Sequence, residues 1–260
     1  MNNLSDIIRR IKQKKELVGI EDSLINELLV RYLKKTNLQI TGINPSQSKI
    51  LIKDIRAELR RYAGRFQVYG KEWKARYSLL ESNNIAPLLK THTSTRERME
   101  FYPELKKLIA HLNVNSILDL GCGINPLALA SKEIRYYASD INKEELELVK
   151  IFFEKNHIEG NVFLCDLRKI EDCPLPDADL CLIFKVLDIL DDKGHKIAEK
   201  IISIVKARRI LISFSTKTLS GKPMHHPRRF WLERLLKKSG YAFEIISSIN
   251  EIFYLVTKSA

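Results

Sequence analysis

The chain has 260 residues, 45% of them hydrophobic, and a formal net charge of +12. Its apolar stretches are shorter than the ~20 residues that a membrane-spanning helix needs, and its N-terminus lacks the apolar core of a secretion signal. We therefore expect a cytoplasmic protein with no membrane partner. Cys122, Cys165, Cys173 and Cys181 show no C-x-x-C spacing. This favours buried reduced thiols over a metal or redox site.

The positive charge is concentrated in the first third of the chain. Residues 1–90 carry 18 Lys and Arg against 9 Asp and Glu, which amounts to +9 of the total +12. Such an excess predicts a polyanionic partner. The alternative is that lysine-rich helices only keep the protein in solution.

Residues 1–90 are expected to form a helical domain. Apolar residues recur at helical spacing after Asp22, and Pro45, which follows the break TGINPS, suits the first turn of another helix. At ~100° per residue, this later helix gathers four basic side chains on one face and leaves Asp54 and Glu58 outside it. The four are Lys49, Lys53, Arg56 and Arg60. The stripe predicts contacts with an RNA phosphate backbone, unless it is simply a solvated helix face.

From about residue 113, short β-branched runs alternate with helical stretches. The expected strands lie near 116–120, 136–140, 161–167, 178–184 and 208–214. The expected helices lie near 126–133, 143–155, 194–206 and 227–239. The segments YAFEIIS and EIFYLVT form a closing hairpin. The pattern predicts an α/β domain over residues 91–260, with a mostly parallel sheet, helices on both faces and a terminal antiparallel strand.

The stretch SILDLGCGINPL (116–127) combines an apolar strand, a glycine turn and a helix start. Gly121 and Gly123 can adopt backbone angles that a side chain forbids, and Pro126 suits the first helical turn. Backbone N–H groups at such a turn can meet a nucleotide-like ligand. The third glycine of the dinucleotide fingerprint G-x-G-x-x-G is missing, so this motif alone is a weak signal.

Polar residues at the ends of the neighbouring strands strengthen the prediction. Asp140 ends the run that starts at Tyr136, Asp166 ends NVFLCD, and Lys185 ends ADLCLIFK. Because open α/β sheets bind ligands at the carboxyl ends of their strands, these residues indicate one crevice. Asp140 can accept both hydroxyls of a ribose there, and it can also cap the helix that starts in SDINKEE.

Four segments of the chain are HTSTRERMEFYPEL (92–105), ILDLGCGINPLAL (117–129), IFKVL (183–187) and SFSTKTLSGK (213–222). They occur in the order found in the aminoglycoside-resistance 16S rRNA methyltransferases, and the chain resembles that family over residues 92–222. The resemblance implies a class I methyltransferase fold and S-adenosylmethionine (SAM) as cofactor. It also implies methylation of guanine N7 in the decoding site, helix 44, of 16S rRNA in the small (30S) ribosomal subunit. A resistance enzyme and a housekeeping relative both fit, because residues 224–231 (MHHPRRFW) depart from the family pattern.

The resemblance also assigns cofactor-binding roles. A guanidinium such as that of Arg96 binds a carboxylate with two hydrogen bonds, here the carboxylate of SAM; the alternative is an exposed helix start with Glu97 in a capping box. Asp166 is expected at the adenine edge or, alternatively, as a helix cap. The expected cofactor-binding residues are Arg96, Asp119, Gly121, Gly123, Asp140, Ile141, Asp166 and Leu167.

Lys185 is the expected catalytic residue. Many DNA and amino-group methylases carry [DNS]-P-P-[YF] at this strand end, where it accepts an N–H proton, but this chain has FKVL. Guanine N7 has a free lone pair and no proton, so its methylation needs alignment and a firmly held flipped base instead of a general base. Lys185 is expected to hold a phosphate or the O6 atom of the base. The alternative is a lysine that snorkels out of the sheet.

Two other functions fit parts of the sequence. A SAM-dependent methyltransferase of a small molecule or of a different RNA fits the crevice, but the basic N-terminus counts against a small molecule. An RNA-binding module without cofactor is disfavoured by the intact Gly121, Gly123 and Asp140. We therefore expect a monomeric enzyme that uses SAM, holds no metal and acts on 16S rRNA in the 30S subunit.

Overall fold

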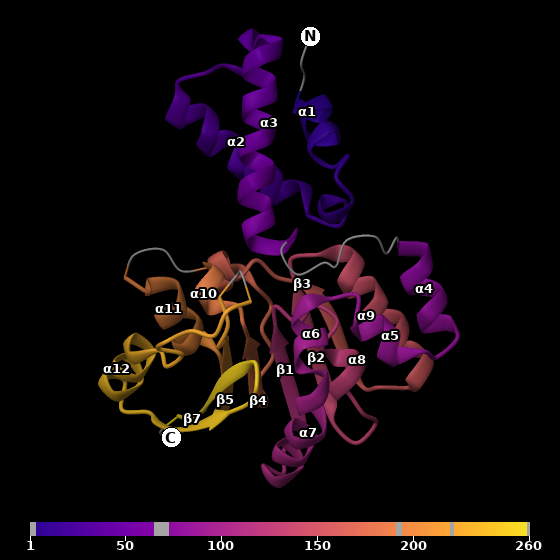
Figure 1. Cartoon of the computed structure of the whole chain (residues 1–260), viewed down its shortest axis with the longest axis vertical. Helices are drawn as coiled ribbons and strands as arrows, with labels where there is room; N and C mark the ends of the chain where they lie inside the picture. The colour runs from indigo at the N-terminus through magenta and orange to yellow at the C-terminus, as the bar shows by residue number, and fades with distance from the viewer. Residues whose placement is uncertain (1–3, 65–72, 191–193, 219–220, 259–260) are drawn as a thin grey trace.

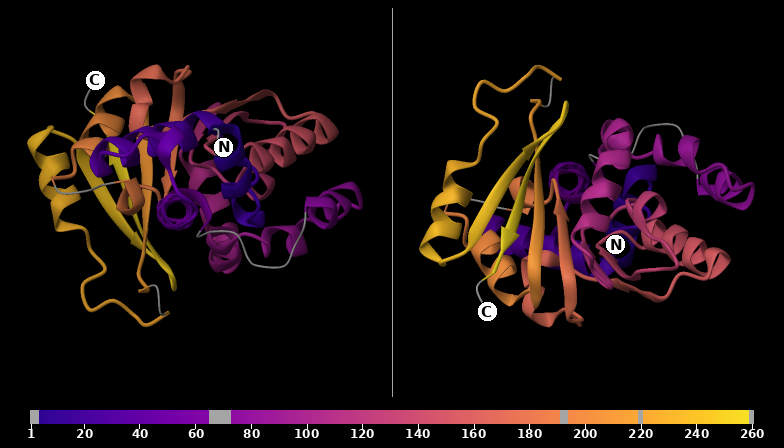
Figure 2. Two further views of the ribbon diagram at one scale, coloured as in Figure 1. Left: turned by 90° about the horizontal axis from the view of Figure 1, so that it is seen from above. Right: turned by 90° about the horizontal axis from the view of Figure 1, so that it is seen from below.

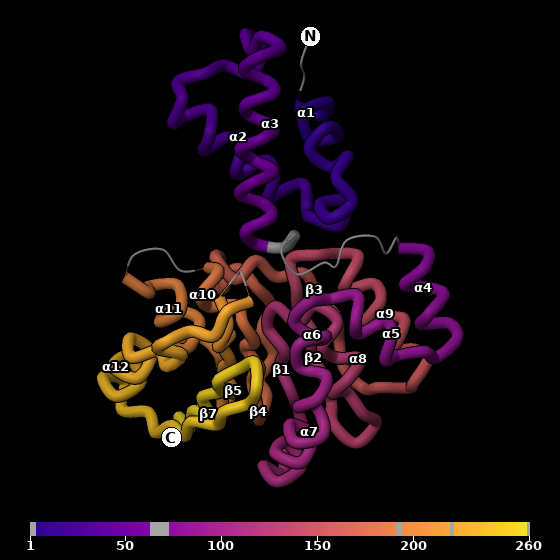
Figure 3. Tube along the Cα trace, viewed as in Figure 1, coloured from indigo at the N-terminus to yellow at the C-terminus, as the bar shows by residue number. Residues whose placement is uncertain are grey.

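The computed structural model of the chain describes residues 4–64, 73–190, 194–218 and 221–258. A small helical region stands on top of a larger α/β region (Figures 1 and 3). The helical region contains α1 (Leu4–Ile11), α2 (Asp22–Thr36) and α3 (Pro45–Leu59), with short 3-10 turns at Lys15–Leu17 and Ile40–Gly42. None of the helices in the described ranges has the length and apolar character of a membrane span.

Helix α3 starts where the sequence predicts. The Asn44 side chain accepts a hydrogen bond from the Gln47 backbone N–H at 2.9 Å, and the Gln47 side chain accepts one from the Asn44 N–H at 3.0 Å. This capping box, followed by Pro45, fixes the first turn. The helix then continues into a π-helical turn, Arg60–Gly64. On its inner side, Leu51, Ile55 and Leu59 join α1 and α2 in a separate hydrophobic core.

The α/β region is built on a seven-stranded sheet in the order β3-β2-β1-β4-β5-β7-β6. The strands are β1 (Ser116–Leu120), β2 (Arg135–Asp140), β3 (Gly160–Leu164), β4 (Ala178–Phe184), β5 (Ala207–Ser215), β6 (Ala242–Ser247) and β7 (Glu251–Thr257). Strands β1 to β5 pair in parallel, whereas β7 is antiparallel to both β5 and β6. The predicted mostly parallel sheet with a terminal antiparallel hairpin is confirmed.

Helices cover both faces of the sheet (Figure 2). One face packs against α4 (Trp73–Glu81), α5 (Ile85–Leu89), α7 (Tyr102–His111), α8 (Pro126–Leu129) and α9 (Lys143–Asn156). The other packs against α10 (Leu187–Leu190), α11 (Lys196–Ile204) and α12 (Phe230–Lys238). Short α6 (Thr93–Arg98) precedes α7, with the 3-10 turn Met99–Phe101 between them. Side chains of a strand alternate between the faces, as Ile117 and Leu118 do.

The hydrophobic core of the helical region and that of the α/β region divide the chain ahead of α4. Leu80 of α4 and Leu88 of α5 belong to the core of the α/β region, because α4 packs on α9 and α5 packs on α8. The core of the helical region ends with Leu59, against which Tyr62 packs. The last two helices of the expected 1–90 domain therefore contribute to the α/β region. Residues 65–72, between the two regions, lie outside the described part of the chain.

Two elements end three or four residues earlier than predicted. Strand β3 ends at Leu164, because Asp166 caps the 3-10 turn Leu167–Asp172 immediately after it. Helix α8 ends at Leu129, since Ala130 is extended. Strand β3 ends at the carboxyl edge of the sheet, and α8 follows the glycine turn at the end of β1.

The prediction of four reduced cysteines is wrong for two of them and correct for the other two. Cys165 and Cys173 form a disulfide, because the 3-10 turn after β3 brings the chain back until their Cα atoms are 5.4 Å apart. Cys122 and Cys181 are free and buried, as predicted. The disulfide closes the loop that carries Asp166 and Leu167.

Candidate functional site

A pocket lies at the carboxyl edge of the sheet, where an open α/β sheet binds its ligands. Its wall is formed by the ends of β1, β2 and β4, by the loop after β3 and by α6. Seven of the eight residues expected to bind cofactor line it. They are Asp119, Gly121, Gly123, Asp140, Ile141, Asp166 and Leu167.

The glycine turn has the conformation that its sequence predicts. Gly121 and Gly123 have φ angles of 66° and 50°, in the left-handed region that favours glycine. A Cβ atom at Gly121 would lie 2.6 Å from Cγ2 of Val186, and one at Gly123 would lie 2.9 Å from Nε2 of His92. Backbone angle and space thus both exclude a side chain, so the main chain itself forms this part of the pocket wall.

Asp140 is held by the backbone on both of its oxygens. The N–H of Gly123 donates to Oδ2 at 2.8 Å, and the N–H of Asn142 donates to Oδ1 at 2.9 Å. Burial raises the pKa of Asp140 to about 6. Each carboxylate oxygen can accept a further hydrogen bond, so the fixed group suits two neighbouring hydroxyls. Asp140 is not the cap of α9, because the side chain of Asn142 accepts from Glu144 N–H at 3.0 Å and takes that role.

Asp119 is buried at the end of β1. Its Oδ2 accepts hydrogen bonds from Nδ2 of Asn125 at 2.8 Å and from the hydroxyl of Tyr136 at 2.7 Å. Burial raises the pKa of Asp119 to about 6. No donor in the described part of the chain binds Oδ1, which leaves that oxygen for an amine or hydroxyl of a ligand.

Asp166 serves as a helix cap, which was one of the two predicted alternatives. Its Oδ1 accepts from the N–H of Arg168 at 3.0 Å, and its carboxylate pairs with the guanidinium of the same residue. Both Asp166 and Leu167 still line the pocket. The negative charge of Asp166 is thus offset within its own loop.

The structure places Arg98, and not Arg96, on the pocket wall. Helix α6 starts at Thr93 without the expected side-chain cap, and its rotation leaves Arg96 exposed while Arg98 is only 1% exposed. Arg98 donates to Oε2 of Glu251 at 2.9 Å and to Oγ of Ser94 at 3.2 Å. The spacing of Ser94 and Arg98, four residues apart on one helix, is the signal that could have identified this arginine.

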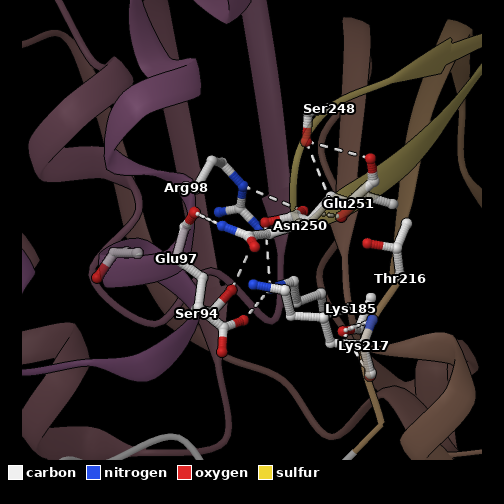
Figure 4. Close-up of polar contacts among 12 residues, drawn as sticks. Ser94, Glu97, Arg98, Lys185, Thr216, Lys217, Ser248, Asn250 and Glu251 are labelled. Atoms are coloured by element: carbon white, nitrogen blue, oxygen red, sulfur yellow. Dashed lines mark hydrogen bonds and ion pairs between the residues drawn. The ribbon is translucent and has the colours of Figure 1, made fainter. Parts of the chain in front are cut away.

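Lys185 lies at the end of β4 in a buried ion-pair network (Figure 4). Its Nζ is 2.6 Å from Oε2 of Glu97 and 3.2 Å from Oε1 of Glu251, and Glu251 also binds Arg98. With 7% exposure, Lys185 does not snorkel out of the sheet. It does not line the pocket, although its neighbours Phe184 and Val186 do. A contact between Lys185 and a target base stays a prediction.

The pocket is also lined by residues that were not among those expected to bind cofactor. His92, Asn125 and Arg168 line the pocket, as does Tyr62 from the π-helical turn after α3. Burial lowers the pKa of His92 to about 4, so its imidazole is neutral at pH 7. The guanidinium of Arg168 lies over the ring of Tyr62, 5.0 Å from its centre. Asn125 lies in the predicted glycine-turn segment, His92 begins the segment 92–105, and Arg168 follows Leu167. Only tertiary packing brings Tyr62 to the pocket, so spacing along the chain gives no signal for it.

The predicted basic stripe lines one groove on the helical region. Lys49, Lys53, Arg56 and Arg60 share it with Arg10 and Lys14. As predicted, Asp54 and Glu58 point elsewhere: Asp54 accepts from Tyr32, and Glu58 pairs with Arg31.

The two arginines of the stripe also support the fold. Arg56 donates to the carbonyl of Ile11 at 3.3 Å, and Nε of Arg60 donates to Oε1 of Glu16 at 2.8 Å. Lys49 and Lys53 are exposed and have no hydrogen bond or ion pair among the described residues. The lysines are therefore the part of the stripe whose charge is available to a partner. Across the described ranges, no group of three or more His, Cys, Asp or Glu side chains is arranged to hold a metal.

The strand order, the glycine turn and the acid at the end of β2 define a class I methyltransferase fold. The model of the ribosomal RNA methyltransferase (FmrO) family matches residues 81–255, and the chain belongs to this family. A 16S rRNA (guanine(1405)-N(7))-methyltransferase of Frankia casuarinae is 27% identical over 184 residues, 67% of this chain and 64% of the relative. The enzyme of that description from Serratia marcescens is 28% identical over 72% of this chain and 75% of its own length.

Solved structures share the fold over nearly the whole chain. The 16S rRNA methyltransferase RmtF, solved in complex with S-adenosyl-L-homocysteine, superposes with a TM-score of 0.81 at 21% identity and covers 98% of both chains. The 16S rRNA methylase RmtB superposes with a TM-score of 0.75 at 22% identity over the full length of both chains. The helical region is thus part of the shared architecture.

Proposed function

We propose that the protein is a SAM-dependent methyltransferase that modifies N7 of a guanine in the decoding site of 16S rRNA. The observation that carries this proposal is the pocket at the carboxyl edge of the sheet, with Asp140 fixed by two backbone N–H groups. Membership of the ribosomal RNA methyltransferase family supports an RNA substrate. The curated relatives named above support guanine N7 of 16S rRNA as the position.

The residues present fit SAM. The carboxylate of Asp140 has acceptor capacity for the two ribose hydroxyls, and the open Oδ1 of Asp119 can accept from the amine of the methionine part. Gly121 and Gly123 leave room for the ligand to approach the main chain. Leu167 and Ile141 offer apolar contacts for an adenine ring.

The chain's own residues then have to hold two reactants in line. SAM supplies a methyl group bound to a positively charged sulfur, and guanine N7 supplies a lone pair. Because N7 carries no proton, no general base is needed, and the site contributes mainly by positioning. Lys185, Glu97, Arg98 and Glu251 form a rigid wall next to the pocket for that purpose. The segment FKVL after β4 also lacks the proton-accepting motif of amino-group methylases.

The groove on the helical region is proposed to bind the phosphate backbone of the RNA. Lys49 and Lys53 are exposed, and their charge is not offset by neighbouring acids. Each phosphate contact made by such a lysine releases counterions and makes affinity depend on salt. The groove thus positions the protein on RNA without reading base sequence. The proposed setting is a cytoplasmic monomer acting on the 30S subunit.

Transfer of tritium from methyl-labelled SAM tests the function. Purified full-length protein is incubated with 30S subunits or with naked 16S rRNA, and the labelled nucleoside is identified by mass spectrometry. The expected result is 7-methylguanosine in the 16S rRNA of 30S subunits. Label in a small molecule with none in 16S rRNA contradicts the proposal and favours a small-molecule methyltransferase. Aminoglycoside susceptibility of bacteria that express the protein separates a resistance role from a housekeeping role.

A further inference from the structure

The helical region contacts both loops that carry the expected cofactor residues. The first loop contains Asn142 and follows β2, whose last residue is Asp140. The second follows β3 and contains Asp166 and Arg168. In Figure 1 the helical region stands above this edge of the sheet, with the lower end of α3 next to it. The contacts on the two loops come from different segments of the helical region.

On the first loop, the chain after α1 pairs with the backbone that holds Asp140. Ile20 and Asn142 form an antiparallel bridge, and the N–H of Lys143 donates to the carbonyl of Gly19 at 2.9 Å. The N–H of Asn142 in turn donates to Oδ1 of Asp140 at 2.9 Å. A continuous series of contacts therefore runs from Gly19 through Asn142 to the carboxylate that faces the pocket.

Gly19 fits against Asn142 only because it has no side chain. A Cβ atom at Gly19 would lie 2.1 Å from Oδ1 and 3.0 Å from Cγ of Asn142. The same Oδ1 accepts from the N–H of Glu144 at 3.0 Å and caps α9, so Asn142 is not free to turn aside. Gly42, also in the helical region, has no atom within 4 Å of its Cβ position. The two glycines therefore differ in their surroundings and form a matched pair for substitution.

On the second loop, side chains make the connection. Glu27 of α2 pairs with Nζ of Lys169 at 2.7 Å and with Nη2 of Arg168 at 3.5 Å. Arg168 binds Asp166 and lies over the ring of Tyr62, which lines the pocket. The helical region is thus attached to the loop at the proposed adenine edge as well.

We propose that Gly19 and Asn142 are positioning residues for the cofactor: the helical region, docked on the loop after β2, holds the Asp140 carboxylate in the orientation that binds the ribose. Glu27 assists by holding the loop after β3. This inference rests on the proposed function, because the ligand is the SAM assigned there. The region that carries the basic groove is therefore also a part of the cofactor site.

The test compares full-length Gly19→Ala with full-length Gly42→Ala. Moving Asn142 removes one hydrogen bond to Asp140, so Gly19→Ala should weaken SAM binding roughly fivefold in a calorimetric titration. KM for SAM should rise by the same factor, while kcat at saturating SAM stays at the wild-type value. Gly42→Ala should change neither. Unchanged SAM affinity in Gly19→Ala overturns the proposal, whereas failure of the wild-type protein to bind SAM contradicts the proposed function itself.

A second variant decides the matter if Gly19→Ala lowers the melting temperature. Glu27→Gln removes the charge that holds Arg168 and Lys169 without adding any atom to a crowded place. Its control is Glu154→Gln, which removes an exposed charge from α9. SAM affinity that falls in Glu27→Gln and not in Glu154→Gln, at equal melting temperatures, supports the positioning role. Equal affinities in the two variants overturn it.

Discussion

The helical region and the α/β region each contain an ion pair that joins two helices, and these two pairs differ in burial. Arg31 and Glu58, which join α2 to α3, form a pair on the surface, whereas Arg76 and Glu145, which join α4 to α9, are 6% and 3% exposed. Exposed pairs contribute ~0–1 kcal/mol to stability, but breaking a buried pair removes several times as much. The buried pair therefore fixes Glu145, which lines the pocket, whereas Arg31 and Glu58 do not line it.

The largest expected effect comes from opening the buried pair. Arg76→Met leaves the Glu145 carboxylate buried without the guanidinium that binds it through two hydrogen bonds, at 2.9 and 2.7 Å. The free energy of unfolding, measured by urea denaturation, should fall by ~3–5 kcal/mol. Arg31→Met, which opens the surface pair, should lower it by at most ~1 kcal/mol. Equal losses of unfolding free energy in the two variants would show that the buried pair is no more important to stability than the surface pair.

The second-largest expected effect is a loss of SAM affinity when Asp140 is replaced. Asp140→Ala should leave the fold intact, because the side chain accepts from backbone N–H groups such as those of Gly123 and Asn142 and forms no ion pair with another described residue. Loss of charge-assisted hydrogen bonds to the ribose should reduce SAM affinity by ~1.5–3 kcal/mol, which is about tenfold or more. Asp54→Ala, which removes an acid from α3, is the control and should bind SAM normally. A calorimetric titration that finds wild-type affinity in Asp140→Ala removes this residue from the cofactor site.

A smaller effect should follow from pH. Because burial raises the pKa of Asp140 to about 6, lowering the pH from 7 to 5 protonates the carboxylate, which removes its negative charge and turns one acceptor oxygen into a donor. SAM affinity should therefore decrease by up to roughly tenfold over this window. Folding stability has the opposite sign: the folded pKa exceeds the ordinary value of 3.8, so this acid contributes less stability as pH rises from about 4 to 6. Affinity that stays constant between pH 5 and 7 contradicts the ribose assignment.

Asp140→Asn sharpens that measurement. The amide keeps one acceptor oxygen and cannot titrate, so most of the pH dependence should disappear. Asp119, whose pKa burial also raises to about 6, should account for the remainder. An unaltered pH profile in Asp140→Asn would assign the whole dependence to Asp119.

The smallest expected effect is on RNA binding by the helical region. Reversing Lys49 and Lys53 to Glu should weaken binding to 30S subunits several-fold at moderate salt. The slope of log affinity against log salt should decrease by about one for each lysine. Lys34 and Lys35 are also exposed but lie on α2, outside the groove, so their reversal is the matched control. Neither variant should change SAM affinity, and equal losses of RNA binding would mean that the groove has no special role.

The sequence was informative where a local motif determines the backbone. Gly121, Gly123 and Asp140 lie within one strand–turn–helix unit and the strand next to it, and this arrangement recurs wherever such a sheet binds a nucleotide-like ligand. The positions of the strands along the chain, and their mostly parallel pairing, followed from the alternation of β-branched and helical runs, which is also a local pattern. These predictions needed no knowledge of distant contacts.

The sequence was less informative where the direction of a side chain or a tertiary contact determines which residues reach the pocket or join a core. Two arginines stand two positions apart in TSTRER, and the rotation of a single helix turn decides which of them is buried. Tyr62 reaches the pocket only because the helical region stands above the sheet. The helices at residues 73–89 have an ordinary helical pattern, and that pattern does not specify which of two cores they join.

Helix α3 and the π-helical turn after it form one uninterrupted rod from Pro45 to Gly64. Lys49 lies toward its outer end, and Tyr62 lies at the pocket. At 1.5 Å per residue, the rod sets these two positions ~20 Å apart. The rod therefore holds the basic groove and the pocket at a fixed spacing. Inserting one residue between Lys53 and Tyr62 would move the lysines by only ~1.5 Å relative to the pocket. It would also turn them by ~100° about the helix axis.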